Sequence, residues 1–253
     1  MLAAVLFVFL DSSLVSERSP CEEFVRLQQN IRAEAIARDS AIAAFKAIIP
    51  KLDEYFARVN RGVSSRNEWR FPIEGYSPHA VGGNGKGYRA YGFDFFAKTK
   101  HNPHPAHDIF ILDDNQDELD DETGAPARVV SVSSGVVVEV RTEWRDTSRS
   151  LGGKYVWIYD PSSKRIFYYA HLRSVFVELG ECVVSGSPIG EVGRTGFHAA
   201  KRRSPTHLHL MVLQIGKDGL PKPINPYKEF WKWKRAPSKQ NGASLSPAPP
   251  NRF

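Results

Sequence analysis

The sequence has little cysteine and lacks the cysteine spacing of a structural zinc site. Only two cysteines occur among 253 residues, Cys21 and Cys182, and neither belongs to a C-x-x-C pair. This spacing excludes a thiolate zinc knuckle. A disulfide between the two cysteines stays open on sequence grounds, and we expect two free thiols.

The helical zinc-protease motif H-E-x-x-H is also absent. A zinc hydrolase with this sequence would therefore lack the glutamate base of that protease class. The chain also has no basic stretch that interleaves regularly with aromatic residues. Its net charge of +6 favours an anionic partner, such as a membrane surface or an acidic wall polymer. Nucleic acid is the anionic partner that the sequence supports least, and we predict no nucleic-acid binding.

The longest apolar run is at the N-terminus and has only about ten residues. Residues 1–10 are apolar, which is too few for a helix that spans a bilayer. Their length suits the h-region of a secretory signal, although no lysine or arginine precedes them. We expect residues 1–20 to be a signal or apolar N-terminal segment, and the protein to be exported to the periplasm or the extracellular space. A buried N-terminal segment is the alternative, and we predict no transmembrane span and no lipid anchor.

Residues 21–66 have the spacing of helices. Apolar residues recur at steps of three to six with charges between them, and Pro50 predicts either two helices or one kinked helix. We interpret this segment as a packing or spacer element outside the catalytic domain. A chain that starts near Arg70 is then expected to fold and to bind zinc by itself.

From Phe71 the sequence becomes rich in glycine, aromatic residues and short β-type runs. The fold class that this predicts is mainly β, with an antiparallel sheet or sandwich over residues 71–235. Expected hairpins join 127–132 to 136–140 and 155–159 to 166–169, and 207–215 is expected to be the last strand. Residues 236–253 are rich in proline, serine and asparagine, which predicts a disordered tail.

Histidines and one aspartate form two short clusters, in which the spacings are even numbers of residues, as for side chains on one face of a strand. His104 and Asp108 are four residues apart, and His207 and His209 are two apart. Because side chains alternate faces along a strand, each of these pairs would share a face, whereas His107 would point the other way.

Imidazole and carboxylate groups are the ligands of hydrolytic zinc. Such sites use three protein ligands and leave the fourth position to water, and two histidines with one aspartate meet that count. His171, at a strand end, and the histidine left over from the His207/His209 pair are candidates for moving protons. Taken singly, each of these residues could equally be a surface or loop residue, so the prediction depends on their combination.

The ordered set of motifs resembles the LytM/lysostaphin-type zinc endopeptidases. The resemblance extends roughly from Phe71 to Ile215. It consists of H-x-x-x-D at 104–108, a hairpin-like segment at 123–137, Y-A-H-L at 169–172, a glycine-punctuated segment at 180–196 and H-L-H at 207–209.

This resemblance implies a β-sheet groove with one zinc ion and cleavage of peptide bonds in peptidoglycan stems or cross-bridges. It implies that His104, Asp108 and His209 are the metal ligands. It also implies that His171 and His207 lie beside the zinc-bound water as catalytic residues.

Three features depart from the family pattern. Ala106 replaces a usual glycine, and the basic stretch 197–205 replaces a short glycine turn. Residues 113–122 are an acidic insertion, which could be a calcium loop, although an EF-hand register from Asp113 places Glu118 where glycine is required. We therefore favour a solvated acidic loop.

Two other functions stay open on sequence grounds. Family relatives that lose ligands act as binding or activator proteins for other wall hydrolases, but all five motif positions are present here. A D-Ala-D-Ala carboxypeptidase uses a similar His/Asp/His zinc set, but the segment 180–196 favours the endopeptidase. The oligomeric state and the bond that is cleaved are not determined by the sequence.

Overall fold

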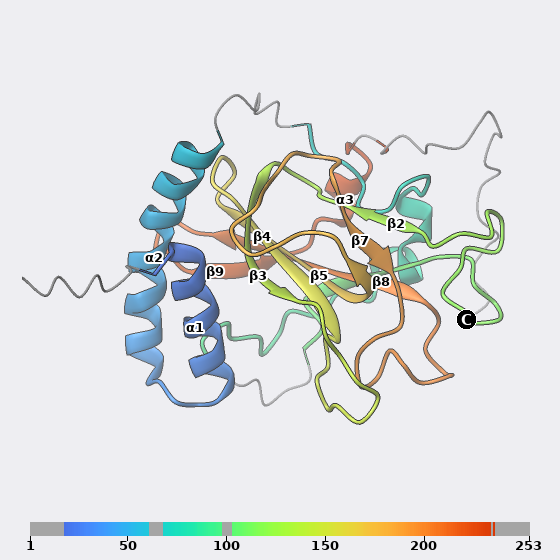
Figure 1. The fold of residues 1–253 in the computed structure, drawn as a ribbon, viewed down its shortest axis with the longest axis horizontal. Helices are drawn as coiled ribbons and strands as arrows, with labels where there is room; N and C mark the ends of the chain where they lie inside the picture. The colour runs from blue at the N-terminus through green and yellow to red at the C-terminus, as the bar shows by residue number, and fades with distance from the viewer. Residues whose placement is uncertain (1–17, 61–67, 98–102, 234, 236–253) are drawn as a thin grey trace, which may run out of the picture.

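The computed structural model describes residues 18–60, 68–97, 103–233 and 235. In this part of the chain nine strands form one sheet with antiparallel pairing, and two helices pack at one side of it (Figure 1). The mainly β fold class with an N-terminal helical segment is thus confirmed. The helices and strands are α1 (Pro20–Arg32), α2 (Arg38–Val59), β1 (Ala106–Phe110), β2 (Arg128–Val130), β3 (Gly135–Arg141), β4 (Lys154–Asp160), β5 (Arg165–Val175), β6 (Cys182–Val183), β7 (Pro188–Val192), β8 (His207–Ile215), β9 (Pro221–Ile224) and α3 (Tyr227–Phe230).

The strand order puts the two motif-bearing strands next to each other at one side of the sheet. The hydrogen-bonded order is β1-β8-β5-β4-β3-β6, with β9 beside β8 and β7 between β5 and β2. The predicted hairpin of β4 and β5 is confirmed, and β8 spans the predicted residues 207–215. The other predicted hairpin is wrong, because β2 pairs with β7 whereas β3 pairs with β4 and β6. A Ser-Ser-Gly turn can join two strands that pair with each other, or it can lead from one strand to a second strand that pairs elsewhere, and here it does the latter.

Each face of the sheet covers its own apolar core, and β8 shows the alternation most clearly. Its residues Leu208, Leu210 and Val212 belong to one core, whereas Met211 and Leu213 belong to the other. We call the second of these the helix-side core, because α1 and α2 complete it. Its buried members on the sheet are Ala106, Val136, Val138, Tyr155, Trp157, Tyr159, Ile166, Ala170, Met211 and Leu213.

Local sequence features determine where α1 begins, and contacts with the sheet determine where both helices pack. A capping box begins α1, in which Ser19 accepts a hydrogen bond from the Glu22 amide and Glu22 accepts one from the Ser19 amide. The turn between the two helices lies between Arg32 and Arg38. Pro50 is therefore inside α2 and does not separate the two helices. Pro50 is exposed, which lets water satisfy the carbonyl that its missing N–H leaves free.

Aromatic side chains join the helices to the sheet. Phe24 of α1 and Phe45 of α2 are fully buried, and the Phe24 ring lies 6.5 Å from that of Trp157 on β4. Phe45 also contacts Phe95 and Phe96, with ring centroids 5.2 and 5.6 Å away, in the segment that precedes β1. The helices therefore share a core with the sheet, on the sheet face opposite to that of Leu208 and Leu210.

An ion pair between the exposed Arg32 and the buried Glu139 ties α1 to the same face. Arg32 donates to both oxygens of Glu139 on β3, at 2.6 and 2.8 Å, and Glu139 is 3% exposed. The hydroxyl of Tyr155 donates a further hydrogen bond of 2.7 Å to Glu139. Burial of a carboxylate is costly unless such partners are present, so loss of Arg32 would leave an uncompensated charge in this core.

Two sequence predictions lie outside the described residues. They are the signal segment, apart from its last residues, and the tail over residues 236–253. None of the described helices is both long and apolar enough to cross a membrane. The division of the chain near Phe71 stays a prediction.

In contrast to the expectation from the sequence, we expect a chain that begins at Arg70 to aggregate, or to unfold at least roughly 10 °C below the full chain, because the helices complete a core of the sheet. Removal of α1 and α2 would expose Val136, Val138, Trp157 and Leu213, which they now help to bury. Thermal denaturation followed by circular dichroism measures the difference, and a chain that begins at Arg18 is the control because it retains both helices. Equal melting temperatures for the two shortened chains would show that the sheet folds without its helical layer.

Candidate metal centre

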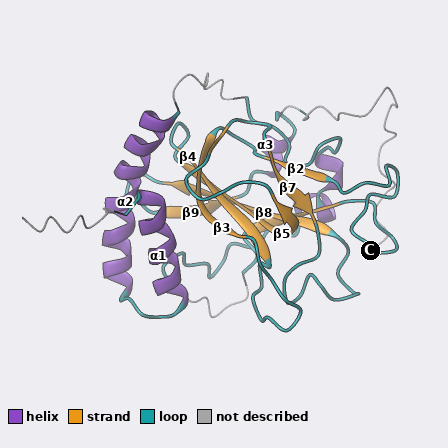
Figure 2. Cartoon of the chain, in the orientation of Figure 1, coloured by secondary structure: helices purple, strands orange, loops and turns teal. Residues whose placement is uncertain are grey.

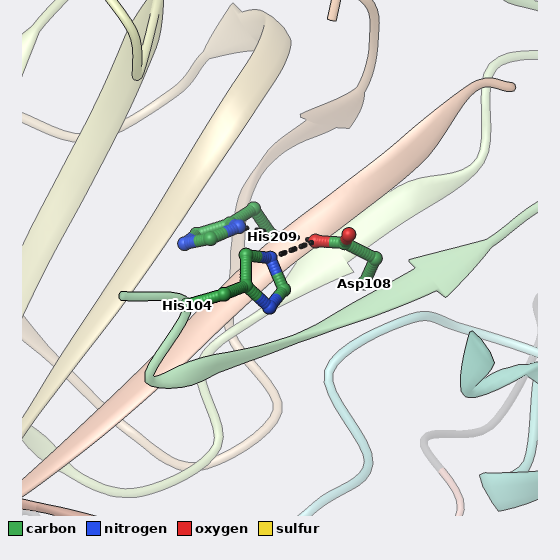
Figure 3. A group of neighbouring side chains, drawn as sticks. All are labelled: His104, Asp108 and His209. Carbon is green, nitrogen blue, oxygen red and sulfur yellow. Dashed lines mark hydrogen bonds and ion pairs between the residues drawn. The ribbon is translucent and has the colours of Figure 1, made fainter. Parts of the chain in front are cut away.

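The centre forms where β1 and β8 pair. Their antiparallel register places Asp108 directly opposite His209, so the two side chains lie on the same face. His104 lies just before β1, where its backbone pairs with Arg89. Asp108 Oδ1 lies 3.2 Å from His104 Nε2 and 3.0 Å from His209 Nδ1. Figure 3 shows the two rings converging on this one carboxylate oxygen.

The face of each histidine agrees with strand parity. His107 points away from Asp108 into the opposite side of the sheet, where its Nε2 lies 2.8 Å from Asn225 Oδ1 and its ring contacts Phe230. His207 shares the face of His209, with its Nε2 3.6 Å from Asp108 Oδ1. The structure thus brings His104, Asp108, His207 and His209 together and leaves His107 as a packing residue.

Three of these side chains have the arrangement of a metal site. One ligand atom each from His104, Asp108 and His209 lies within 4.8 Å of the others, and this is the one such group of three among the described residues. His104 Nδ1 lies 3.2 Å from the Gly87 carbonyl oxygen, which can only accept. Nδ1 is therefore protonated. Nε2 can donate to Asp108 only while the ring is charged, and it offers its lone pair to a metal ion when that second proton is lost.

Two further imidazoles stand beside the three ligand candidates. Nδ1 of His171 donates to the Thr195 carbonyl at 2.8 Å, and Nδ1 of His207 donates to the Pro205 carbonyl at 2.7 Å. These bonds leave the Nε2 lone pair of each ring free in the neutral form. The two ring centroids are 4.9 Å apart, and that of His171 is 5.5 Å from His209.

His171 has a backbone conformation that is uncommon for a residue with a side chain. Its φ is +65°, in the left-handed region, and it lies where β5 leaves β4 and β8 to pair with β7. Gly196 makes room for its ring, because a Cβ there would lie 2.9 Å from His171 Nδ1 and would also collide with the Leu151 carbonyl. Such conformations persist where the surrounding structure holds them in place, and they are common at functional sites.

The electrostatics of the centre are dominated by one carboxylate among imidazoles. Burial alone would raise the pKa of Asp108, but hydrogen bonds from His104 and His209 and the nearby imidazoles hold it well below its usual range. Burial works against the charged form of His104, yet the bond to Asp108 outweighs it and raises the pKa. Burial lowers the pKa of His207 and, with the neighbouring imidazoles, lowers that of His171 further. The last two rings are therefore neutral at neutral pH.

The acidic insertion is organised by its own backbone and is not freely solvated. Asp113 is buried and accepts hydrogen bonds from the amides of Asp117 and Glu118, at 3.0 Å each, and from the Thr206 hydroxyl at 2.5 Å. Asp120 accepts from Tyr76 and from a backbone amide. These carboxylates thus have protein partners, so the solvated-loop interpretation was incomplete, and no calcium-type cluster occurs among the described residues.

The acidic insertion also packs against the basic stretch, so two of the three departures from the family pattern lie together. Gln116 donates to the Arg202 carbonyl at 2.9 Å, and Arg194 donates to the carbonyls of Lys201 and Ser204. The backbone amide of Arg194 in turn donates to Glu118. These hydrogen bonds fix the position of residues 197–205, the segment that leads into β8 at His207.

Sequence reasoning missed the groups that orient the imidazoles. The carbonyls of Gly87, Thr195 and Pro205 act through the backbone and leave no signature in side-chain type. Gly196 was visible only as one member of a glycine-rich run. Tyr168, whose ring lies 6.1 Å from His209, could have been found from the alternation of β5.

Exposed side chains flank His171 on the side of Gly196. Phe197 is 36% exposed, and its amide donates to the Ser150 carbonyl next to Leu151, which is 61% exposed. Lys201 Nζ lies 4.3 Å from the centre of the Phe197 ring. The side of the centre next to His171 is thus bordered by apolar and basic groups.

Solved structures of peptidases are similar to parts of this chain. A zinc-containing peptidase from Vibrio cholerae is 22% identical, with a TM-score of 0.42 over 64% of this chain and 40% of that chain. A Ruminococcus gnavus protein named as a glycyl-glycine endopeptidase lytM is 30% identical, with a TM-score of 0.36 over 44% of this chain and 43% of that chain. The catalytic domain of lysostaphin from Staphylococcus simulans is 22% identical, with a TM-score of 0.37 over 58% and 89%. This chain thus spans less than half of the first two proteins.

A family comparison locates the relationship within the chain. No curated protein sequence matches it. Residues 118–226 match peptidase family M23, and this segment contains His171, His207 and His209, whereas His104 and Asp108 precede it. This match over residues 118–226 agrees with the resemblance to LytM/lysostaphin-type peptidases that the sequence predicts.

Proposed function

We propose that this protein is a zinc metalloendopeptidase that hydrolyses peptide bonds in peptidoglycan stems or cross-bridges. The observation that carries the proposal is the convergence of His104, Asp108 and His209 within 4.8 Å on one sheet face, next to a peptidase family M23 segment. The proposed compartment is the cell envelope, either the periplasm or the extracellular space.

The donor set fits one zinc ion per chain. Two imidazole nitrogens and one carboxylate oxygen are a known set of protein ligands for catalytic zinc, and three of them leave a position open for water. When bound, zinc supplies a Lewis acid and a water molecule with a lowered pKa. All three side chains are partly exposed, so an ion can reach them from solvent. The hydrogen bond from His104 to Gly87 orients this ligand before the metal arrives.

His171 and His207 are proposed to serve the chemistry and not to bind the metal. Both rings lie on the metal face, both are held through Nδ1 by backbone carbonyls, and both keep an Nε2 lone pair. A neutral ring at this position can accept a proton from the attacking water through Nε2, and a ring protonated at Nε2 can donate a hydrogen bond to the developing oxyanion. We propose that the two rings divide these tasks.

The borders of the centre suit a peptide with acidic character. Phe197 and Leu151 offer apolar contact beside His171, and Lys201, Arg202 and Arg203 are exposed on the loop that follows. Carboxylates of a peptidoglycan stem would be attracted to this loop, which agrees with the net charge of +6. The α1–α2 pair lies further along the same sheet face and would limit how far a substrate extends in that direction.

The direct test is mass spectrometry of the fragments that the purified zinc-loaded protein releases from peptidoglycan. We expect peptides with new amino and carboxyl termini inside a stem or a cross-bridge. Release of a terminal D-alanine alone would indicate the carboxypeptidase alternative. Absence of both products from a zinc-loaded protein would favour a binding or activator function.

Substitution Asp108→Ala should abolish stoichiometric zinc binding. The carboxylate is a proposed ligand, and it also accepts hydrogen bonds from the two proposed histidine ligands. Zinc content after dialysis, measured by inductively coupled plasma mass spectrometry, should fall from about one ion per chain toward zero, the ratio that a single three-ligand site implies. The matched control is Asp114→Ala, an exposed acid on the 113–122 loop. Full zinc occupancy in the Asp108 variant would refute the ligand assignment.

Substitutions His171→Ala and His207→Ala should keep zinc and lose activity. Removal of a positioned acid–base group lowers turnover by about 10²–10⁴-fold. Turnover is measured by fragment release and occupancy by metal analysis of the same samples, with His79→Ala as a control outside the centre. A parallel loss of zinc and activity would make that residue a ligand, and full activity in both variants would contradict the proposed mechanism.

Substitution Gly196→Ala should lower turnover while zinc remains bound. The new methyl group would meet His171 Nδ1 and the Leu151 carbonyl, and would displace a ring that is not a proposed ligand. A loss of at least 10-fold is expected, since small misplacement of a catalytic group is costly. Gly124→Ala is the control, because Gly124 also has a positive φ, +64°, but open space around it. If both variants lose activity equally, backbone strain and not the position of His171 is responsible.

A further inference from the structure

The two cysteines of the chain lie on the same side of the sheet, at the contact between helix and sheet. Cys21 is in the first turn of α1 and is completely buried, and Cys182 is half-buried on the edge strand β6. Cys182 pairs with Val136 of β3. Because paired residues in an antiparallel ladder share a face, the Cys182 side chain points toward the helix-side core, to which both Val136 and Cys21 belong.

Tyr55 of α2 marks the place where these elements meet. Its hydroxyl donates to the carbonyl of Gly180, two residues before Cys182, at 3.2 Å. Burial raises the pKa of Tyr55, and so do charges on Cys21 and on Cys182. Burial likewise raises the pKa of Cys21 to about 12, with Cys182 as the second cause. Cys21 is a buried member of the helix-side core, and both Tyr55 and Cys182 pack against that core.

We propose that Cys21 and Cys182 form an intramolecular disulfide when the protein enters an oxidising compartment. The bond would tie the first turn of α1 to the edge strand of the sheet. Both thiols are free in the structure.

The reaction requires a small disulfide or an oxidised dithiol protein as the two-electron oxidant. The Cys182 thiolate is the attacking group, because it is the more exposed of the two. It attacks one sulfur of the donor and releases the other as a thiolate, which leaves a mixed disulfide on Cys182. The Cys21 thiolate then attacks the Cys182 sulfur and releases the second donor thiolate. The protein loses two protons and two electrons, and the donor disulfide becomes two thiols.

The cross-link would act on the layer that covers part of the metal face. It closes a loop that contains both helices and strands β1 to β5, and a long loop gives a large gain in the chain-entropy account. The helices then stay on the sheet when the Arg32–Glu139 ion pair is weakened. This inference does not depend on the proposed peptidase activity, and its test measures thiols and melting temperature only.

The test uses the folded full-length chain incubated with oxidised glutathione and without denaturant. We expect both thiols to become resistant to alkylation after denaturation, and mass spectrometry to find one linked pair of peptides containing Cys21 and Cys182. The melting temperature should rise by roughly 5–10 °C and return to its original value with dithiothreitol. Because the pKa of Cys182 is raised by burial, the reaction should be faster at pH 9 than at pH 7.

The variants Cys182→Ser and Cys21→Ala serve as controls, and neither should show the glutathione-dependent rise in melting temperature. A Cys182→Ser chain should also fail to accumulate a mixed disulfide, whereas Cys21→Ala should accumulate one on Cys182. The proposal is overturned if the folded wild-type chain retains two alkylatable thiols, if it stops at a mixed disulfide, or if the linked peptides come from two different chains.

Discussion

The centre depends on the register between β1 and β8. Asp108 faces His209 across this pair, and a shift of one residue would turn the carboxylate to the other side of the sheet. Buried residues on both strands prevent that shift, because Ile109 and Leu210 would have to exchange faces with the polar residues beside them. The apolar alternation that folds the sheet is therefore also what brings the proposed metal ligands together.

The same alternation explains why the helices and the metal centre share a face. Odd-numbered residues of β8 run from His207 and His209 at one end to Met211 and Leu213 at the other, so polar and apolar parts form one continuous surface. The helices cover the apolar part, and the Arg32–Glu139 pair fixes α1 over β3. In Figure 2 both helices lie at the side of the sheet where β3 and β4 run. His104, Asp108 and His209, on the side of β1 and β8, stay partly exposed.

Backbone carbonyls complete the centre. His104, His171 and His207 each direct Nδ1 to a carbonyl oxygen, which leaves Nε2 unprotonated on the metal side in every neutral ring. Hydrogen bonds from His104 and His209 and the nearby imidazoles stabilise the charged carboxylate of Asp108, which explains the low pKa of its carboxyl group. Gly196 contributes only the space that its missing side chain leaves beside His171.

The sequence by itself determined the fold class, the last strand and the face of each motif histidine, because apolar alternation and a two-residue period are local properties of a strand. It did not determine which strands pair, since pairing depends on contacts between distant residues, and the expected hairpin at 127–140 was wrong for this reason. The position of the helices on the face of the proposed centre, the approach of Cys21 to Cys182 and the Thr195 carbonyl that orients His171 were decided by tertiary structure alone. Each of these requires backbone segments that are far apart in the chain to meet, and residue type carries no record of such a meeting.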